Sequence, residues 1–204
     1  MHNPTDKPTL PAAGKFVDDI RALYAQGLDQ ETLWAGIKDA MAPLLADPGL
    51  KQSSKTWPLT VEDAPKVKNL LFDEDPDYGL VFNATVRKAH SVTSIHDHGD
   101  IWTLYGIIEG NETMNRFDRT DDGPRDEGPA ILKQVGMGQI GPGDIDAVPP
   151  GKIHQEQGGA TNSMAFIVRA RKAGTFKQHS YNTETGEVNV NNGPALIPYA
   201  LEPA

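Results

Sequence analysis

The spacing of apolar residues predicts two helices near the start of the chain. Over residues 15–24 the apolar side chains that recur at the spacing of one helical face are Phe16, Val17, Ile20, Leu23 and Tyr24. After Asp29, a predicted N-cap, a second stripe runs through Leu33, Trp34, Ile37, Met41, Leu44 and Leu45. Pro43 is expected to kink or end this helix. Stripes of this kind pack on a core, so we expect both helices to cover another part of the protein.

From about residue 72 the pattern changes to short runs that favour β-strands. The expected strands are 80–88, 101–108, 112–118, 130–135, 144–148 and 163–171. Turns rich in glycine, proline and aspartate separate them, and this combination predicts an all-β sandwich or barrel. We therefore expect a helical extension over residues 1–71, packed outside, and a β-barrel domain with a C-terminal tail over residues 72–204.

Composition narrows the class of protein. The 204 residues contain no cysteine and carry a formal net charge of −9. The missing cysteines exclude disulfides, iron–sulfur clusters and thiolate metal sites, and the acidic balance argues against binding nucleic acid. No stretch has the roughly 20 apolar residues that span a bilayer, and residues 1–7 lack the pattern of a secretory signal. We expect a cytoplasmic protein that acts on a small molecule and binds no membrane.

Three histidines stand out by their spacing. His96 and His98 are two residues apart, so on an extended strand their side chains point to the same side. His154 follows in a run rich in glycine and proline, and a distant strand that carries it would complete a set of imidazoles around a divalent metal. The alternative to a metal site is that His96 and His98 are polar residues on an exposed strand and that His154 is a hydrogen-bonded core residue. We expect His90 to be structural or to lie near the metal, and His179 to be a surface residue.

These histidines lie in two motifs that resemble those of the cupin superfamily. The first motif is His-x-His, three or four residues, Glu, six residues and Gly. Its counterparts here are His96, His98, Thr103 and Gly110. The second is Gly, five residues, Pro-x-Gly, two residues and His, matched by Gly143, Pro149, Gly151 and His154. The resemblance covers residues 80–172. It implies a mainly β fold, a double-stranded β-helix (jelly-roll) barrel with the metal in its mouth, and pairing into a homodimer.

The departure at Thr103 shapes the expected chemistry. Thr103 replaces the glutamate of the motif and is a poor metal ligand, so we expect it beside the metal with His96, His98 and His154 as ligands. Three neutral imidazoles leave the charge of the metal uncompensated and favour an anionic substrate alongside O₂. Asp100 or Glu156 could restore a carboxylate ligand. Otherwise Glu156 is expected to orient one of the imidazoles.

A three-histidine cupin preceded by helices is similar to the cysteine dioxygenase-like family of thiol dioxygenases. The run over residues 95–110, with His-Asp-His and a later Gly-Ile-Ile-Glu-Gly turn, carries this resemblance. It implies Fe(II), a thiol substrate and O₂. The family's Ser-x-His-x-Tyr run has no counterpart in residues 163–171, which read Ser-Met-Ala-Phe-Ile-Val-Arg-Ala-Arg. The resemblance therefore supports the three metal ligands more strongly than it supports a thiol substrate.

Three classes of function follow. The first is an Fe(II) dioxygenase acting on a small anionic substrate. The second is an isomerase, hydrolase or decarboxylase that uses Zn, Mn or Ni, and the third is a cupin that binds a small ligand without catalysis. Tyr105 is a candidate catalytic residue because its phenol could meet oxygen or substrate. Arg87 and Arg169 are candidates to bind a substrate carboxylate, and a surface ion pair is the alternative for each arginine, including Arg171.

Overall fold

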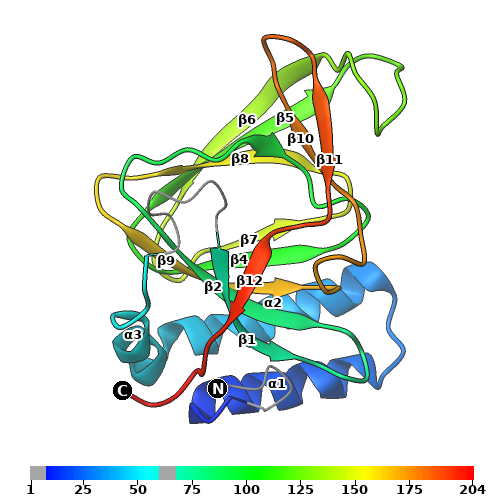
Figure 1. Cartoon of the computed structure of the whole chain (residues 1–204). Coiled ribbons are helices and arrows are strands. Elements are labelled where there is room, and N and C mark those ends of the chain that lie inside the picture. The colour runs from blue at the N-terminus through cyan, green and yellow to red at the C-terminus, as the bar shows by residue number, and fades with distance from the viewer. Residues whose placement is uncertain (1–7, 60–67) are drawn as a thin grey trace.

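Two six-stranded β-sheets form the body of the described chain, which in this computed structural model comprises residues 8–59 and 68–204 (Figure 1). In order, the first sheet consists of β12 (Ala195–Pro198), β1 (Lys68–Glu74), β2 (Val81–Arg87), β9 (Ser163–Arg169), β4 (Thr103–Glu109) and β7 (Ile145–Val148). The second consists of β11 (Val188–Asn191), β10 (Gln178–Tyr181), β3 (Ile95–His96), β8 (Ile153–Gly158), β5 (Glu112–Arg119) and β6 (Leu132–Ile140). Only the pairing of β1 with β12 is parallel among these strands.

Strands β2 to β9 follow the order of a jelly roll. One sheet holds β2-β9-β4-β7 and the other holds β3-β8-β5-β6, so the chain passes repeatedly between the sheets. This confirms the predicted double-stranded β-helix. The topology also places strands distant in sequence side by side, as it does for β3 and β8, where His96 is paired with His154.

Three helices of the described chain pack on the outer face of the first sheet (Figure 1). They are α1 (Pro11–Tyr24), α2 (Gln30–Ala46) and α3 (Pro48–Ser54). The side chain of Asp29 caps α2 as predicted, because it accepts a hydrogen bond of 3.0 Å from the backbone N–H of Thr32. Pro43 lies inside α2 and does not end it. The sequence pattern did not predict α3, which starts after its own cap, Asp47.

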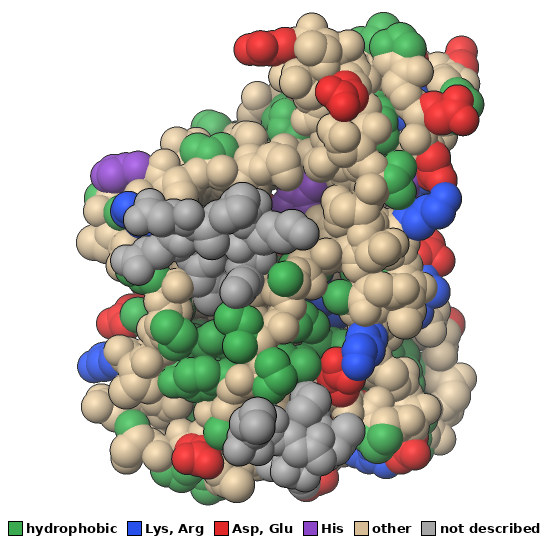
Figure 2. All heavy atoms as spheres, in the orientation of Figure 1, with side chains coloured by type: hydrophobic (Ala, Val, Ile, Leu, Met, Phe, Trp, Pro, Cys, Tyr) green, Lys and Arg blue, Asp and Glu red, His purple; other side chains and the backbone are tan. Residues whose placement is uncertain are grey.

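Alternation along the strands gives the first sheet two different faces. On β2, Phe82, Ala84 and Val86 belong to the core shared with the helices. The ring of Phe16 on α1 lies 5.9 Å from the ring of Phe82 and 5.9 Å from that of Phe166, both edge-on. The opposite face of these strands turns into the barrel. In Figure 2, apolar side chains gather mainly in the lower half of the face in view.

Several strands were not predicted from the sequence. They are β1, β10, β11 and β12, whereas the strands expected to carry the histidines correspond to β3, which ends at His96, and β8. Strand β6 ends at Ile140, well beyond the expected run over residues 130–135. The expected boundary between residues 71 and 72 falls inside β1. No helix in the described ranges is both long and apolar enough to span a membrane.

Candidate metal centre

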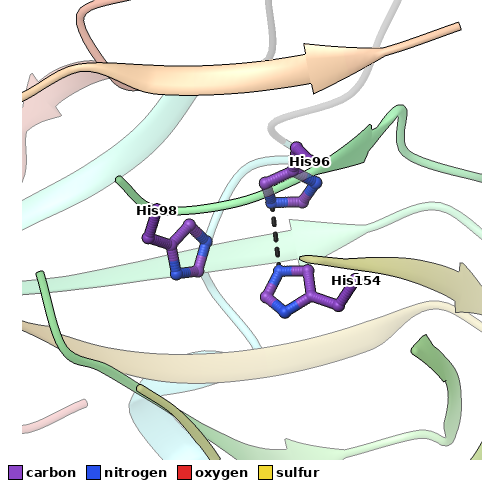
Figure 3. A group of neighbouring side chains, drawn as sticks. All are labelled: His96, His98 and His154. Carbon is purple, nitrogen blue, oxygen red and sulfur yellow. Dashed lines mark hydrogen bonds between the residues drawn. The ribbon is translucent and has the colours of Figure 1, made fainter. Parts of the chain in front are cut away.

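His96, His98 and His154 converge inside the barrel, as the spacing predicts (Figure 3). All three are buried, and one ring nitrogen from each lies within 4.8 Å of the others. The Nε2 atoms of His96 and His154 are 3.2 Å apart across the β3–β8 pair. His98 comes from the segment immediately after β3. The cluster therefore comes from β3 with the segment that follows it, and from β8 of the same sheet.

Asp97 anchors the segment that carries two of these histidines. Because side chains alternate along an extended chain, its carboxylate points away from the cluster. It accepts a hydrogen bond of 3.0 Å from the hydroxyl of Tyr181 and lies 3.0 Å from Nδ1 of His179. Burial opposes ionisation of Asp97, but hydrogen bonds from the backbone of Gly99 and from His179 outweigh it and lower its pKa. The predicted surface position of His179 was wrong, since it is 2% exposed and also contacts Asp126.

Gly99 ties the two motifs together. Its φ of 65° is unfavourable for other residues, and a Cβ there would lie 1.9 Å from the carbonyl oxygen of Lys177. Its own carbonyl accepts a hydrogen bond of 2.7 Å from the backbone N–H of Gly151. The glycines of the two motifs therefore hold the loop after His98 against the turn that precedes His154.

Burial keeps the imidazoles of His98 and His154 neutral. It lowers the pKa of His154 to about 3, because attraction to Glu156 is outweighed by burial together with repulsion from His96 and Arg116. Burial, followed by repulsion from His154, also holds the pKa of His98 well below its usual range. Neutral rings present lone pairs, which a divalent metal requires.

The second nitrogens of the rings differ in what they meet. Nδ1 of His96 is 3.0 Å from the carbonyl oxygen of Ser94 and donates to it, which leaves Nε2 free to face the cluster. Nδ1 of His98 is buried without a hydrogen-bond partner among the described residues. Three converging imidazoles fit a bound transition metal, and imidazole suits Fe, Zn and Ni alike.

His154 has an unusual partner at Nδ1. Nη1 of Arg116 lies 3.3 Å away, and a guanidinium only donates, so Nδ1 of His154 accepts. The proton of the neutral ring is then on Nε2, directed at His96. Arg116 is held in place by Asp146. A metal bound at Nε2 of His154 would take the place of this proton, and a ring that stays neutral would then carry its proton on Nδ1.

The two acids considered as extra ligands have different positions. Asp100 is exposed and pairs with Arg171, which confirms the surface pairing of that arginine and separates Asp100 from the cluster. Glu156 is 5% exposed, and its Oε1 lies 3.6 Å from Nε2 of His154. Burial would raise the pKa of Glu156, but His96, His154 and Arg87 outweigh it and hold the carboxyl ionised. Thr103 lies on the interior face of β4, where its hydroxyl has no partner among the described residues.

A cavity of about 290 Å³ opens beside the cluster. Its lining includes His96, His98, Tyr105, Glu156 and both candidate arginines, Arg87 and Arg169. In Figure 2 a histidine side chain is visible in the hollow between the two sheets. A surface ion pair is therefore wrong for Arg87 and Arg169, which are 6% and 7% exposed.

The two buried arginines differ in their contacts. Nε of Arg87 donates to Glu112 at 3.0 Å, so its charge is compensated within the protein. Nε and Nη1 of Arg169 have no hydrogen-bond partner in the described chain. Burial, only partly offset by Glu156 and Tyr105, lowers the pKa of Arg169 to about 10. At neutral pH it remains a cation without a counter-ion in contact, which favours binding of an anion in the cavity.

Tyr105 belongs to an internal hydrogen-bond network. Its hydroxyl donates to Glu112 at 2.9 Å and accepts from Nη2 of Arg87 at 3.4 Å. Burial raises the pKa of Tyr105 well above its usual value, despite the opposing effect of Arg87. Ser163 also donates to Glu112. No pattern in the sequence points to Glu112, because its partners lie on three other strands.

Two further placements bear on the sequence hypotheses. Ala165 and Ile167 are buried together with Tyr105 and Ile107 on the interior side, so the positions where a histidine and tyrosine were sought are apolar. His90 is exposed, with a φ of 60°, in the turn after β2. It lies on the protein surface and takes no part in the cluster. His2 lies outside the described residues.

No protein-family model and no curated protein matches the chain. Among solved structures, it is similar to a protein of Bacillus halodurans, with 8% identity over 62% of this chain and 80% of the other and a TM-score of 0.45. It is also similar to a cupin domain of Schizosaccharomyces pombe, with 8% identity over 51% of this chain and 60% of the other and a TM-score of 0.40. A recombinant oxalate oxidase in complex with glycolate has 15% identity over 46% of this chain and 42% of its own, with a TM-score of 0.36. The chain spans less than two thirds of the length of the last two. Such likeness concerns the fold alone.

Proposed function

We propose that this chain is a non-haem iron dioxygenase that brings a small anionic substrate and O₂ together at Fe(II) held by His96, His98 and His154. The observation that carries the proposal is the cluster of three buried imidazoles that opens into a cavity containing an unpaired guanidinium. Neutral ligands leave the charge of a divalent ion largely in place. The metal and Arg169 would thus attract the same anion from two directions.

The metal would supply one part of the chemistry. When bound, Fe(II) activates O₂ and accepts an anionic group of the substrate at a neighbouring position. The protein supplies orientation: the hydrogen bond from His96 to the carbonyl of Ser94 fixes the ring so that Nε2 faces the metal. Strands β3 and β8 belong to one sheet, which holds the ligands rigidly.

Arg169 would orient the substrate. A planar guanidinium can bind a carboxylate through two parallel N–H donors. Nε and Nη1 of Arg169 have no hydrogen-bond partner in the described part of the protein, so this guanidinium has donors to offer. Holding a reactant at two points converts an encounter into a step within one complex and lowers the barrier. The cavity volume of about 290 Å³ restricts the substrate to a small molecule.

We assign Tyr105 a positioning role. Its proton is donated to Glu112, and burial keeps the phenol protonated. Arg87 compensates the charge of Glu112 from the other side. The network therefore presents a neutral hydroxyl and a fixed wall to the cavity, and it keeps water away from the cluster.

Oxygen uptake after anaerobic loading with Fe(II) tests the proposal. The wild-type protein is offered a panel of small thiols and a panel of keto acids and diketones, with the Zn(II)-loaded protein as the redox-inert control. We expect uptake with at least one small carboxylate-bearing compound and none with zinc. Arg169→Met should raise KM for that compound by at least tenfold, whereas Arg171→Met, which changes a surface pair, should not.

The alternative classes have their own signature in this experiment. Absence of uptake with every compound, together with tight stoichiometric zinc, would overturn the dioxygenase. Turnover of a keto acid by the zinc-, manganese- or nickel-loaded protein would then identify an isomerase, hydrolase or decarboxylase. Binding of the same compounds without turnover would identify a cupin that only binds its ligand.

A further inference from the structure

The carboxylate of Glu156 has one oxygen in use and one without a hydrogen bond. Thr93 donates to Oε2 at 2.7 Å and fixes the side chain. Oε1 lies 3.6 Å from Nε2 of His154 and 3.9 Å from Nη2 of Arg87, and both separations are too long for hydrogen bonds. Glu156 is two residues beyond His154 on β8, so both side chains point to the same face. One carboxylate oxygen is thus left facing the cluster and the cavity.

Separations within the cluster fit those between atoms that bind one metal. Bonds from a metal to nitrogen and oxygen are about 2.0–2.2 Å long, which places neighbouring ligand atoms about 3.0–3.5 Å apart in octahedral or tetrahedral sites. The Nε2 atoms of His96 and His154 are 3.2 Å apart, within this range. The 3.6 Å between Oε1 of Glu156 and Nε2 of His154 exceeds it only slightly. A small side-chain adjustment would bring Oε1 to a shared metal.

Arg87 does not account for the position of this carboxylate. Its Nε donates to Glu112 at 3.0 Å, and its Nη2 is closer to the hydroxyl of Tyr105, at 3.4 Å, than to Glu156, at 3.9 Å. Oε1 of Glu156 therefore has no hydrogen-bond donor among the described residues. A bound divalent cation at the imidazole cluster would satisfy it.

We propose that Glu156 is the fourth protein ligand of the metal, so that the centre consists of three histidines and one carboxylate. The carboxylate comes from β8, two residues after His154, and thereby replaces the glutamate that Thr103 lacks on β4. Four protein ligands leave two positions of an octahedron, enough for one substrate atom and O₂. This inference rests on the metal centre of the proposed function but not on its oxygen chemistry.

The experiment uses redox-inert zinc, so its outcome is independent of dioxygenase activity. Competition with a chelator measures Zn(II) affinity in the wild type, in Glu156→Gln and in Glu109→Gln, the same change at an exposed carboxylate at the end of β4. We expect the dissociation constant to rise about 10- to 100-fold in Glu156→Gln and to stay within about twofold in Glu109→Gln. The visible spectrum of the Co(II)-loaded protein should change in Glu156→Gln alone, because a ligand is lost.

Each other result has a definite meaning. An unchanged affinity overturns the proposal, and so does a weaker affinity with an unchanged Co(II) spectrum, since Glu156 would then act only through the imidazoles. If the Glu156 variant does not fold, the crystal structure of the Zn(II)-loaded wild type decides. A Zn–Oε1 bond of about 2.0–2.2 Å supports the ligand, and a separation above about 3 Å excludes it. A wild type that binds no zinc would overturn the metal centre and the proposed function together.

Discussion

The two faces of the first sheet are built from the same strands and have opposite properties. Toward the helices, Phe82, Leu104 and Phe166 are at most 1% exposed and contact only the apolar core. Toward the barrel interior, Arg169 and Tyr105 are also buried, but they carry charge or hydrogen-bonding groups. Burial alone therefore does not separate the structural from the functional residues of this protein. The property that sets Arg169 apart is that its Nε and Nη1 have no hydrogen-bond partner among the described residues, whereas the hydroxyl of Tyr105 has two partners.

This difference has an energetic consequence. An apolar side chain on the outer face contributes to stability through its transfer from water and its packing. An unpaired cation such as Arg169 lowers stability, because burial removes hydration without a compensating contact. Protein sites of this kind persist where function requires them. The comparison predicts that substitutions on the outer face reduce stability, while removal of unpaired groups on the inner face does not.

The largest effect on stability is expected for Phe166→Ala on the outer face. Phe166 packs between the rings of Phe16 and Phe72, so its loss leaves a cavity in the shared core. The free energy of unfolding should fall by about 3–5 kcal/mol, as urea denaturation would measure. The folded fraction should still bind metal with wild-type stoichiometry. A loss below about 1 kcal/mol would show that the helices contribute little to the barrel.

An intermediate effect is expected for Asp97→Asn, in the metal-free protein. Asp97 is buried and accepts hydrogen bonds from Tyr181 and from the backbone of Gly99, and the variant should lose about 2 kcal/mol at neutral pH. Its pKa is lowered in the folded state, so the stabilisation exists above the unfolded value of about 3.9 and is lost as the pH falls through the folded value.

Unfolding curves at a series of pH values check this sign. The difference between the wild type and Asp97→Asn should shrink below about pH 4. Asp126→Asn removes the more exposed carboxylate that also contacts His179, and it should cost clearly less stability than Asp97→Asn. Equal losses in the two variants, or a difference that grows in acid, would contradict the role of Asp97.

The smallest effect on stability is expected for Arg169→Met on the inner face. Replacing an unpaired buried cation by an apolar side chain of similar length should leave the free energy of unfolding unchanged or raise it by about 1 kcal/mol. Because the folded-state pKa of Arg169 is lowered to about 10, wild-type stability should rise as the pH increases above 10, whereas the variant lacks this rise. A loss of 2 kcal/mol or more would show that Arg169 is a structural residue.

The sequence predicted what depends on local periodicity and motif spacing. Helical stripes located α1 and α2, and the apolar runs located strands such as β2 and β4. The spacing of the motif glycines and histidines predicted that His96, His98 and His154 would meet. The helical stripes depend on residues close together in the chain, and the motif spacing is typical of the fold.

The missed features depend on contacts between distant segments. His179 is buried because β10 pairs with β3, which brings it to Asp97, 82 residues earlier in the chain. Strand β3 has two residues, too few to show any periodicity. The compensation of Arg87 by Glu112, and the lack of it for Arg169, follows from which strands are neighbours in the barrel. Composition and spacing carry no record of these pairings.

Metal content is the most direct test of the interior face as a metal centre. The wild type and His154→Ala are each equilibrated with Fe(II) under anaerobic conditions, passed over a desalting column and analysed for bound iron. We expect about one iron per wild-type chain and a loss of at least 90% of it in His154→Ala. The control variant His90→Ala, which changes a surface residue, should keep its metal. Full metal retention in His154→Ala would contradict a metal centre on the interior face.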